Sequence, residues 1–450
     1  YRKHIQKTPE GFVITEFLPK VPWSGKYNTI SCAAALHIYE GSWLNDQQFI
    51  SDYEKFWLAG GLPGLRTYSF PLAHAMLRQA EVTNDTTLVV AALPGLVKNY
   101  LVWEKENLDS NGLYWQQDGK DGMEVSIGGS GPSNGDGYRA TINSYMYGEA
   151  KAIAGIAILA RQPELAIEFA KKSATIKKNL QDKLWDEPAS FFKVIGRNSG
   201  AVFCPARELH GYTPWFFNLP DPAYSKAWKF LMQPDHFYAP YGPTTAEQKA
   251  AGFNISYKGH ECQWNGPSWP LATSITLTAM ANTLNHYEQD FISSVDYFKL
   301  LSNYAKSHQR IREDGKRVAW IDENLNPYTG DWISRTRLKT WEKGTWSAEK
   351  GGVERGKDYN HSSFCDLVIS GLIGVQPALG DYLAVSPLIP ENTWDYFCLD
   401  NLAYHEKKLT IFYDKTGRHY KRGKGFHVLV NGRPAASAPT LEKIELYLNK

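Results

Sequence analysis

Residues 138–184, YRATINSYMYGEAKAIAGIAILARQPELAIEFAKKSATIKKNLQDKL, are the stretch of sequence that decides the fold. Apolar side chains recur in it every three to four positions, which is the period of an amphipathic helix. Pro163 divides the stretch, because proline suits the first turn of a new helix. The two halves therefore predict two helices joined by a tight connection. Their apolar positions are Ile142, Tyr145, Met146, Ile153, Ile156 and Ala157, then Leu165, Phe169, Ile176, Leu180 and Leu184, with Lys171, Lys172, Lys177 and Lys178 on the opposite face.

Helical periodicity continues over most of the chain, from about Trp43 to Leu372. Further helices are predicted at residues 49–58, 70–77, 88–101, 271–284 and 291–304. The links at 107–137 and 254–270 are rich in Gly, Pro, Asn and Trp and are longer than most connections in compact domains. Long loops often carry function. The sequence therefore predicts a mainly α protein made of helical hairpins with functional loops between them.

The pattern changes after about residue 380. Residues 383–387, 409–413, 426–430 and 444–448 read as short strands of period two, and Asn431-Gly432 is a natural hairpin turn between two of them. We therefore expect an irregular lead-in over residues 1–28, a helical catalytic domain over 29–378 and a small β domain over 379–450.

Composition excludes several classes of protein. The 49 Lys and Arg nearly balance the 47 Asp and Glu, so nucleic acid is not an expected partner. No apolar run reaches the roughly 20 residues that span a membrane. Five scattered cysteines, without a C-x-x-C pair, argue against a zinc site and a disulfide framework. Because the sequence begins with Tyr1 rather than Met, an export signal could have been removed, which favours a periplasmic or secreted location.

Aromatic residues are 14% of the chain, and sugar rings stack on such side chains, although core packing accounts for most of them. Three loop segments combine these residues with carboxylates. The first, at 118–124, reads DGKDGME and leads to Arg139; the second, at 261–270, reads ECQWNGPSWP; the third, at 320–330, reads WIDENLNPYTG. Glycosidic cleavage needs a protonated acid at the leaving oxygen and a carboxylate that activates water or attacks directly. Two carboxyls from distant loops meet that need.

The same segments carry a resemblance to a known group. The segment WNGPSW at 264–269 resembles the W-x-G-P-x-W loop of glycoside hydrolase family 63 and the related mannosylglycerate-hydrolase-like domains, whose fold is an (α/α)6 barrel. The segment ENLNPYTG at 323–330 is similar to the group's E-x-Y-N-P-x-T-G segment, and DGME at 121–124 resembles its S-G-M-D-N segment. The resemblance covers roughly residues 40–375.

This resemblance implies a mechanism. It implies an inverting glycosidase in which Glu323 is the general base and Glu124 the general acid, with the two carboxyls roughly 6.5–9.5 Å apart and no cofactor. Asp121 is the alternative acid. Glu124 stands where the group has Asp, and Leu325 replaces a Tyr. These departures bear on the choice of substrate more than on the type of reaction.

Other residues of the three loops are expected to bind the substrate, an oligosaccharide or glycan end. Trp264 and Trp269 are predicted pocket walls. His210, His260 and His361 lack metal-ligand spacing, so no metal is expected. A charged, Trp-bearing insertion at 342–355 is predicted to be a lid over the pocket. The remaining candidates for substrate binding are Arg139, Asp121, Glu261, Asn265 and Trp320.

Two other functions compete with an exo-acting glycosidase. A polysaccharide lyase uses the same helical architecture but needs a Tyr or His base and cationic residues, and a glycan-binding protein keeps the aromatic groove without working acids. Glucose, mannose, rhamnose and arabinose are all compatible with the sequence. The sequence does not determine the linkage, the choice between endo and exo action, or the oligomeric state.

Overall fold

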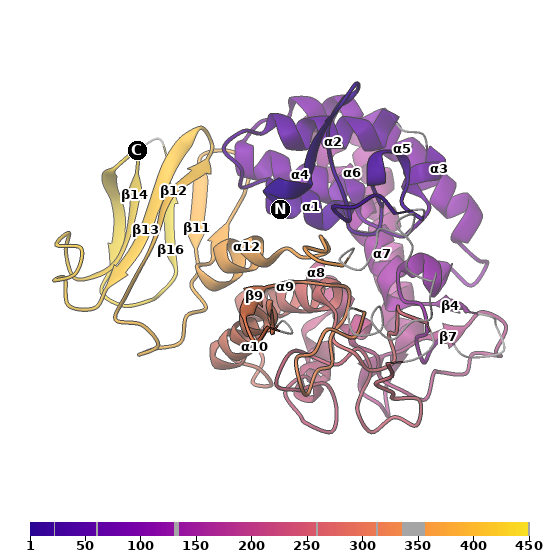
Figure 1. Ribbon diagram of the computed structural model, residues 1–450. Coiled ribbons are helices and arrows are strands. Elements are labelled where there is room, and N and C mark those ends of the chain that lie inside the picture. The colour runs from indigo at the N-terminus through magenta and orange to yellow at the C-terminus, as the bar shows by residue number, and fades with distance from the viewer. Residues whose placement is uncertain are drawn as a thin grey trace.

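The computed structural model describes residues 1–21, 23–59, 62–129, 135–257, 260–311, 314–334 and 356–448, with only the backbone of residues 62 and 63. The predicted lid at 342–355 lies outside these residues. A helical part occupies one side of the molecule, and the C-terminal strands form a separate layer beside it (Figure 1).

The long helices coincide with the periodic stretches of the sequence. Helix α6 (Ala140–Leu159) and helix α7 (Pro163–Leu184) form the predicted hairpin, and Arg161, at φ 57°, turns the chain between them. The other predicted helices are α2 (Gln48–Ala59), α4 (Leu72–Thr83), α5 (Thr87–Asn107), α9 (Pro270–His286) and α10 (Ser294–Ser307).

Six helical segments follow one another in a closed sequence of contacts. Helix α1 (Ala34–Gly41) packs on α4, α4 on α6, α6 on the short α8 (Thr213–Phe216), and α8 on α9. Helix α9 contacts the π-helical segment η7 (Leu367–Leu372), which continues α12 (Phe364–Asp366), and α12 returns to α1. Helices α2, α5, α7 and α10 pack against these segments, and the amphipathic α7 and α10 each bury one face. The structure is thus rich in helices, with a strand region at the C-terminal end.

The lead-in, expected to be irregular, contains the hairpin β1 (Ile5–Thr8) and β2 (Gly11–Ile14). Gly11 adopts φ 118°, a conformation open to glycine, at the end of the tight turn. Strand β2 packs on α2. The side chain of His4 contacts Asp358 O at 2.6 Å, and Asn360 N donates to Glu16 O at 3.1 Å. The lead-in is therefore fixed to a segment more than 340 residues away.

The C-terminal strands form two antiparallel sheets. One has the order β12 (Tyr396–Tyr404), β13 (Lys407–Asp414), β14 (Gly425–Val430) and β15 (Arg433–Ala438), and the other β10 (Val375–Gln376), β11 (Tyr382–Val385) and β16 (Ile444–Tyr447). Val430 pairs with Arg433 across the predicted turn, where Asn431 and Gly432 both have positive φ.

Short elements complete the chain. They are η1 (Arg2–His4), η2 (Lys26–Asn28), α3 (Leu62–Leu65), β3 (Trp115–Gln117), η3 (Gly119–Asp121), β4 (Asp136–Tyr138), β5 (Trp185–Asp186), β6 (Phe191–Phe192), β7 (Ile195–Gly196), η4 (Leu209–Tyr212), η5 (Pro222–Phe230), β8 (Gln309–Ile311) and β9 (Arg317–Ala319).

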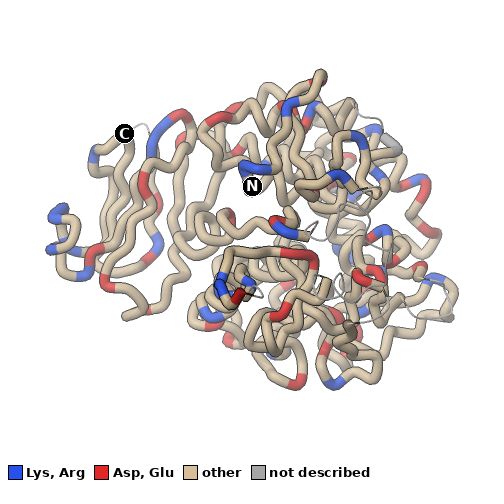
Figure 2. The backbone as a smooth tube through the Cα atoms, in the orientation of Figure 1, with Lys and Arg blue, Asp and Glu red and all other residues tan. Residues whose placement is uncertain are grey.

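Charged residues of both signs are interspersed over the helical part and the C-terminal strands (Figure 2). Among the described residues, no helix has the length and apolar character needed to cross a membrane.

The contact between α6 and α8 gives a test of the helix packing. A Cβ on Gly148 of α6 would lie 2.4 Å from the ring of Phe217, which follows α8. Overpacking of this kind costs about 1–3 kcal/mol, so we expect Gly148→Ala to lower the free energy of unfolding. On the same helix, the nearest atom to a Cβ on Gly155 is 3.6 Å away, an ordinary contact, and Gly155→Ala should stabilise by up to about 1 kcal/mol. Urea unfolding measures both variants, and equal stabilisation of the two would contradict the close packing.

Candidate active site

One cavity of about 280 Å³ brings together residues from all three loops singled out in the sequence. Glu124 of the first loop, Glu261, Trp264 and Trp269 of the second and Glu323 of the third line it together. The other lining residues are Glu16, Trp23, Ile30, Cys32, Tyr68, Gly122, His260, Cys262, Leu271, Tyr359 and His361.

A tight turn positions Glu124. Asp118 Oδ1 accepts a hydrogen bond from Gly119 N at 2.8 Å, and Asp118 O accepts one from Met123 N at 2.8 Å. Gly122 has φ 77°, and a Cβ there would lie 2.8 Å from Cys32 Sγ. Glycine therefore fits this turn on two grounds, backbone conformation and close approach.

The chain just after Glu124 is anchored by a residue that the sequence analysis did not single out. The buried carboxylate of Glu208 accepts hydrogen bonds from Ile127 N at 2.9 Å and Gly128 N at 3.1 Å. His210 Nε2 lies 3.3 Å from the same carboxylate. Although burial alone would raise the pKa of Glu208, the hydrogen bond from His210 and the nearby Arg139 lower it. Glu208 thus stays ionised and holds the acid loop.

The electrostatics of the cavity suit Glu124 to donate a proton. Glu124 is partly exposed to the cavity, yet the surrounding protein desolvates it. Desolvation, together with the negative charges of Glu323, Asp118 and Glu16, raises the pKa of Glu124 to about 8. A carboxyl with this pKa is protonated at neutral pH, as a general acid must be.

Glu323 is held by the chain around it and is nearly buried, at 4% exposure. Its backbone N donates to Asp322 Oδ1 at 2.8 Å, and its Oε2 accepts from Ser334 Oγ at 3.3 Å. The buried Asn324 donates to Glu261 O at 2.8 Å. The candidate base segment is therefore fixed to the Trp-containing loop.

The side chain of Leu325 does not line the cavity. It is 2% exposed and packs with Trp320 and Trp332 in a small apolar cluster. Its backbone exchanges two hydrogen bonds of 3.0 Å with Ser268. The Tyr-to-Leu departure from the family motif therefore falls in this cluster and does not line the cavity.

Two stacked tryptophans form one wall of the cavity. The rings of Trp264 and Trp269 are 4.5 Å apart between centroids and 18° from parallel. Trp269 Nε1 donates to Gln263 O at 2.7 Å, whereas the buried Nε1 of Trp264 has no hydrogen-bond partner among the described residues. A Cβ on Gly266 would lie 2.3 Å from Asn254 O, so this loop packs closely on the preceding chain.

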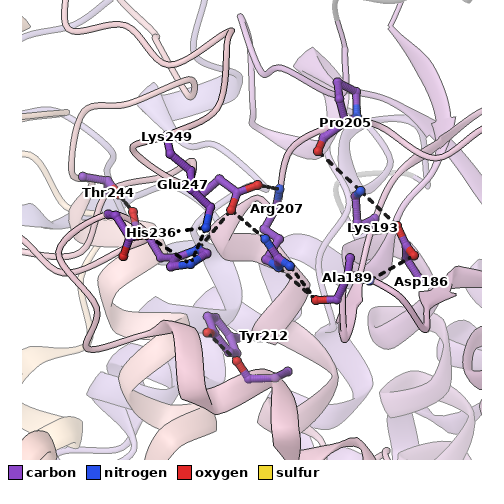
Figure 3. A network of polar contacts seen from close by, with 12 residues as sticks. Asp186, Ala189, Lys193, Pro205, Arg207, Tyr212, His236, Thr244, Glu247 and Lys249 are labelled. Atoms are coloured by element: carbon purple, nitrogen blue, oxygen red, sulfur yellow. Dashed lines mark hydrogen bonds and ion pairs between the residues drawn. The ribbon is translucent and has the colours of Figure 1, made fainter.

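Arg207, His236 and Glu247 belong to one polar network (Figure 3). Arg207 Nη1 pairs with Glu247 Oε2 at 2.8 Å, and His236 Nδ1 lies 3.0 Å from the same oxygen. Between these residues, Thr245 Oγ1 donates to Pro267 O at 3.0 Å and accepts from Gly266 N at 3.1 Å. Thr245, two residues before Glu247 in the chain, thereby holds the backbone of the Trp-containing loop at Gly266 and Pro267.

Four predicted binding residues do not line the cavity. The fully buried Arg139 donates to Gly135 O and Gln116 O, and Asn265 donates to Gly252 O at 3.3 Å. Trp320 lies beneath the guanidinium of Arg310, 5.1 Å from it. Asp121 is buried against an adjacent small void and accepts a hydrogen bond from Thr141. Burial raises the pKa of Asp121, and the charge of Arg139 opposes this rise.

Sequence reasoning missed Glu16, Trp23, Tyr68 and Tyr359, and it considered His361 as a metal ligand, which its spacing argued against. None of the five lies in a recognisable motif. The one available signal was the pairing of an acid and a Trp in the lead-in, and it is weak.

Among the described residues, no group of three or more His, Cys, Asp and Glu side chains is arranged to hold a metal ion. All five cysteines lie in the described part and are free thiols. Burial raises the pKa of Cys32, so its side chain stays a thiol in the cavity wall.

The comparison with protein families defines the chain first as a glycoside hydrolase domain. Residues 26–362 match the family model described as the mannosylglycerate hydrolase MGH1-like glycoside hydrolase domain, and the chain belongs to this family. The resemblance inferred from the three motifs is thereby confirmed.

Solved structures are similar to this chain in fold. A protein named "Sialidase" is 40% identical over 99% of this chain, with a TM-score of 0.88, and the chain spans 39% of that protein. A GH63 mannosylglycerate hydrolase from Thermus thermophilus, in complex with glucose, matches 72% of this chain and 95% of its own at 12% identity and a TM-score of 0.55. A GH78 family rhamnosidase of Bacillus sp. GL1 matches 85% of this chain and 36% of its own at 9% identity and a TM-score of 0.56. The last two share the fold.

The raised pKa of Glu124 predicts a pH-dependent effect on stability. Between its ordinary value of 4.5 and about 8, the unfolded chain has lost this proton and the folded chain keeps it. The unfolded state then binds fewer protons, so the free energy of unfolding falls as pH rises through this window. We expect Glu124→Gln to gain stability relative to wild type from pH 4.5 to about 8, and the gain to level off above.

Urea unfolding at pH 5, 6, 7 and 8 measures this difference. Glu288→Gln, which alters an exposed carboxyl outside the site, is the control and should show no pH-dependent difference. A constant difference for Glu124→Gln across the series would mean that Glu124 is ionised throughout.

Proposed function

We propose that this domain is an exo-acting, inverting glycosidase built on an (α/α)6 toroid. In this proposal Glu124 protonates the leaving oxygen, and Glu323 takes a proton from the water that attacks the anomeric carbon. The observation that carries it is the placement of two glutamates from distant loops in one cavity, where desolvation and the second carboxyl keep Glu124 protonated. The closed sequence of six helical contacts supports the toroid.

The charge of the cavity favours a neutral terminal sugar. Its described lining includes four carboxyls, Glu16, Glu124, Glu261 and Glu323, and no Lys or Arg. A sialic acid or a uronate brings its own carboxylate, which would meet these like charges without a Lys or Arg among the described lining residues to pair with. The 40% identical relative named "Sialidase" is a longer protein, and this domain matches 39% of it.

A panel of aryl glycosides and oligosaccharides tests the reaction. We expect hydrolysis of a neutral terminal sugar, and NMR of the first product formed should show the anomer opposite to that of the substrate. Release of the same anomer would contradict inversion and favour a covalent intermediate.

Substitution of the two glutamates separates their roles. We expect Glu124→Gln to lose about 10²–10⁴-fold in kcat/KM on substrates with poor leaving groups, and far less on a dinitrophenyl glycoside, which leaves without protonation. Glu323→Gln should lose activity on both kinds of substrate, because water activation is needed in each case. On substrates with poor leaving groups, wild-type kcat/KM should fall above about pH 8 as Glu124 ionises, and the residual kcat/KM of Glu124→Gln on the same substrates should lack this fall.

Asp121→Asn is the matched variant for the alternative acid. Asp121 does not line the cavity that contains Glu124 and Glu323, so this change should not produce the leaving-group dependence described for Glu124→Gln. If Asp121→Asn shows that dependence and Glu124→Gln does not, Asp121 is the acid.

A polysaccharide lyase is the alternative reaction on the same architecture. Its unsaturated product absorbs in the ultraviolet, and a hydrolase product does not. The absence of Lys and Arg from the described cavity lining disfavours a lyase, since a uronate substrate needs its charge neutralised. Full activity of Glu124→Gln and Glu323→Gln would refute the mechanism, and binding of glycans without any turnover would favour a non-catalytic binding protein.

A further inference from the structure

Glu16 is a third carboxyl in the cavity with no place in the proposed mechanism. It is 3% exposed and lines the same cavity as Glu124 and Glu323. It belongs to the lead-in, before residue 26, where the match to the family model begins. The cavity is therefore completed by a segment outside the matched region.

The position of Glu16 is fixed at several atoms. Its backbone N donates to Asn28 O at 3.1 Å, and its backbone O accepts from Asn360 N at 3.1 Å. In the side chain, Oε2 accepts from Ser24 Oγ at 2.7 Å, and Oε1 lies 3.2 Å from His361 Nε2. A carboxylate oxygen can accept more than one hydrogen bond, so Glu16 keeps acceptor capacity toward the cavity.

His361 offers a donor beside this acceptor. Tyr359 OH lies 2.5 Å from His361 Nδ1. Burial raises the pKa of Tyr359 well above its usual range, so the phenol keeps a proton that it can donate to Nδ1. In that arrangement the hydrogen of a neutral imidazole is on Nε2. His361 is 2% exposed, and its Nε2 has no aligned hydrogen-bond partner among the described residues.

We infer that Glu16 and His361 together bind one hydroxyl of the sugar in this cavity, and that this pair helps to set specificity; the inference rests on the proposed glycosidase function. A sugar hydroxyl is both a donor and an acceptor. It donates to Glu16 and accepts from His361 Nε2, which lies 3.2 Å from Glu16 Oε1 but makes no aligned hydrogen bond to a described residue.

The same segment presents an aromatic face at the cavity. Trp23 lines it and is 43% exposed, with its ring 5.9 Å from that of Phe17. An exposed indole suits stacking with the group attached to the bound sugar. The lead-in thus supplies both a hydroxyl-binding carboxylate and an apolar surface.

Deoxy sugars test the inference directly. For the sugar that the wild type hydrolyses, each monodeoxy aryl glycoside is compared between wild type and Glu16→Ala. We expect Glu16→Ala to lower kcat/KM on the parent glycoside by about 10- to 100-fold, the effect of losing a charged hydrogen bond. For one deoxy analogue, the wild-type kcat/KM should be lower than on the parent glycoside by a similar factor. On that analogue, Glu16→Ala and the wild type should have the same kcat/KM.

Two further variants separate binding from folding. Glu10→Ala changes an exposed glutamate of the same lead-in, paired with Lys26 at 2.5 Å, and should leave the deoxy profile unchanged. Glu16→Gln keeps the shape of the side chain, and if Glu16→Ala does not fold, the same comparison is made with this variant. The inference is overturned if removal of each hydroxyl lowers kcat/KM by the same factor in the variant as in the wild type. It is also overturned if the variant and the wild type have equal kcat/KM on the parent glycoside.

Failure of the proposed function would be seen separately, as a wild-type protein that hydrolyses no glycoside. In that case saturation-transfer NMR with free glucose, mannose, rhamnose and arabinose compares wild type and Glu16→Ala. Binding that is lost only in Glu16→Ala supports the inference. Equal binding to both proteins, or binding to neither, overturns it.

Discussion

Desolvation of several carboxyls that share one cavity is the constraint on which the candidate site depends. Glu16, Glu124, Glu261 and Glu323 line one cavity, and its described lining has no Lys or Arg to compensate them. In a low dielectric, each ionised carboxyl makes ionisation of a neighbouring one less favourable. Desolvation, and after it the charges of Glu323, Asp118 and Glu16, raises the pKa of Glu124 to about 8. Glu16 and Glu323 each accept a hydrogen bond from a serine hydroxyl.

Loops, rather than helices, carry these side chains, and hydrogen bonds between loops supply the necessary rigidity. Asn324 joins the segment of Glu323 to the Trp-containing loop, and Glu208 holds the chain after Glu124. The closed sequence of helices provides the base from which these loops extend. A site of this kind is preorganised by its supporting contacts, so changes behind the cavity would alter catalysis without touching a substrate.

The sequence predicted the elements whose signal is local. Helices α7 and α10 each bury one apolar face, helices α6 and α9 are 20 and 17 residues long, and the turn at Asn431-Gly432 has the residues its geometry requires. Helix α1 was missed because its 8 residues are fewer than the roughly 11–18 over which helical periodicity is recognised. The hairpin of the lead-in was missed because its strands are only four residues long.

For the candidate site, the sequence predicted Glu124 and Glu323 in loops that resemble the family motifs. It could not show which side chains of an irregular segment face a cavity. Trp320 and Glu323 are three residues apart and point to different surroundings, one to an apolar cluster and one to the cavity. Glu16 could not be found by any local pattern, since it reaches the cavity through contacts with residues far along the chain.

The joining of the lead-in to residues 358–361 has a consequence for how the protein is made. His4 and Asp358 are 354 positions apart. At roughly 5–20 residues per second, a ribosome needs about 20 to 70 seconds to synthesise that interval. During this time the first hairpin has left the ribosome but its later partner does not exist, so the cavity stays open on one side. Because the cavity needs both the lead-in and residues 358–361, it is among the last parts of the helical region to form.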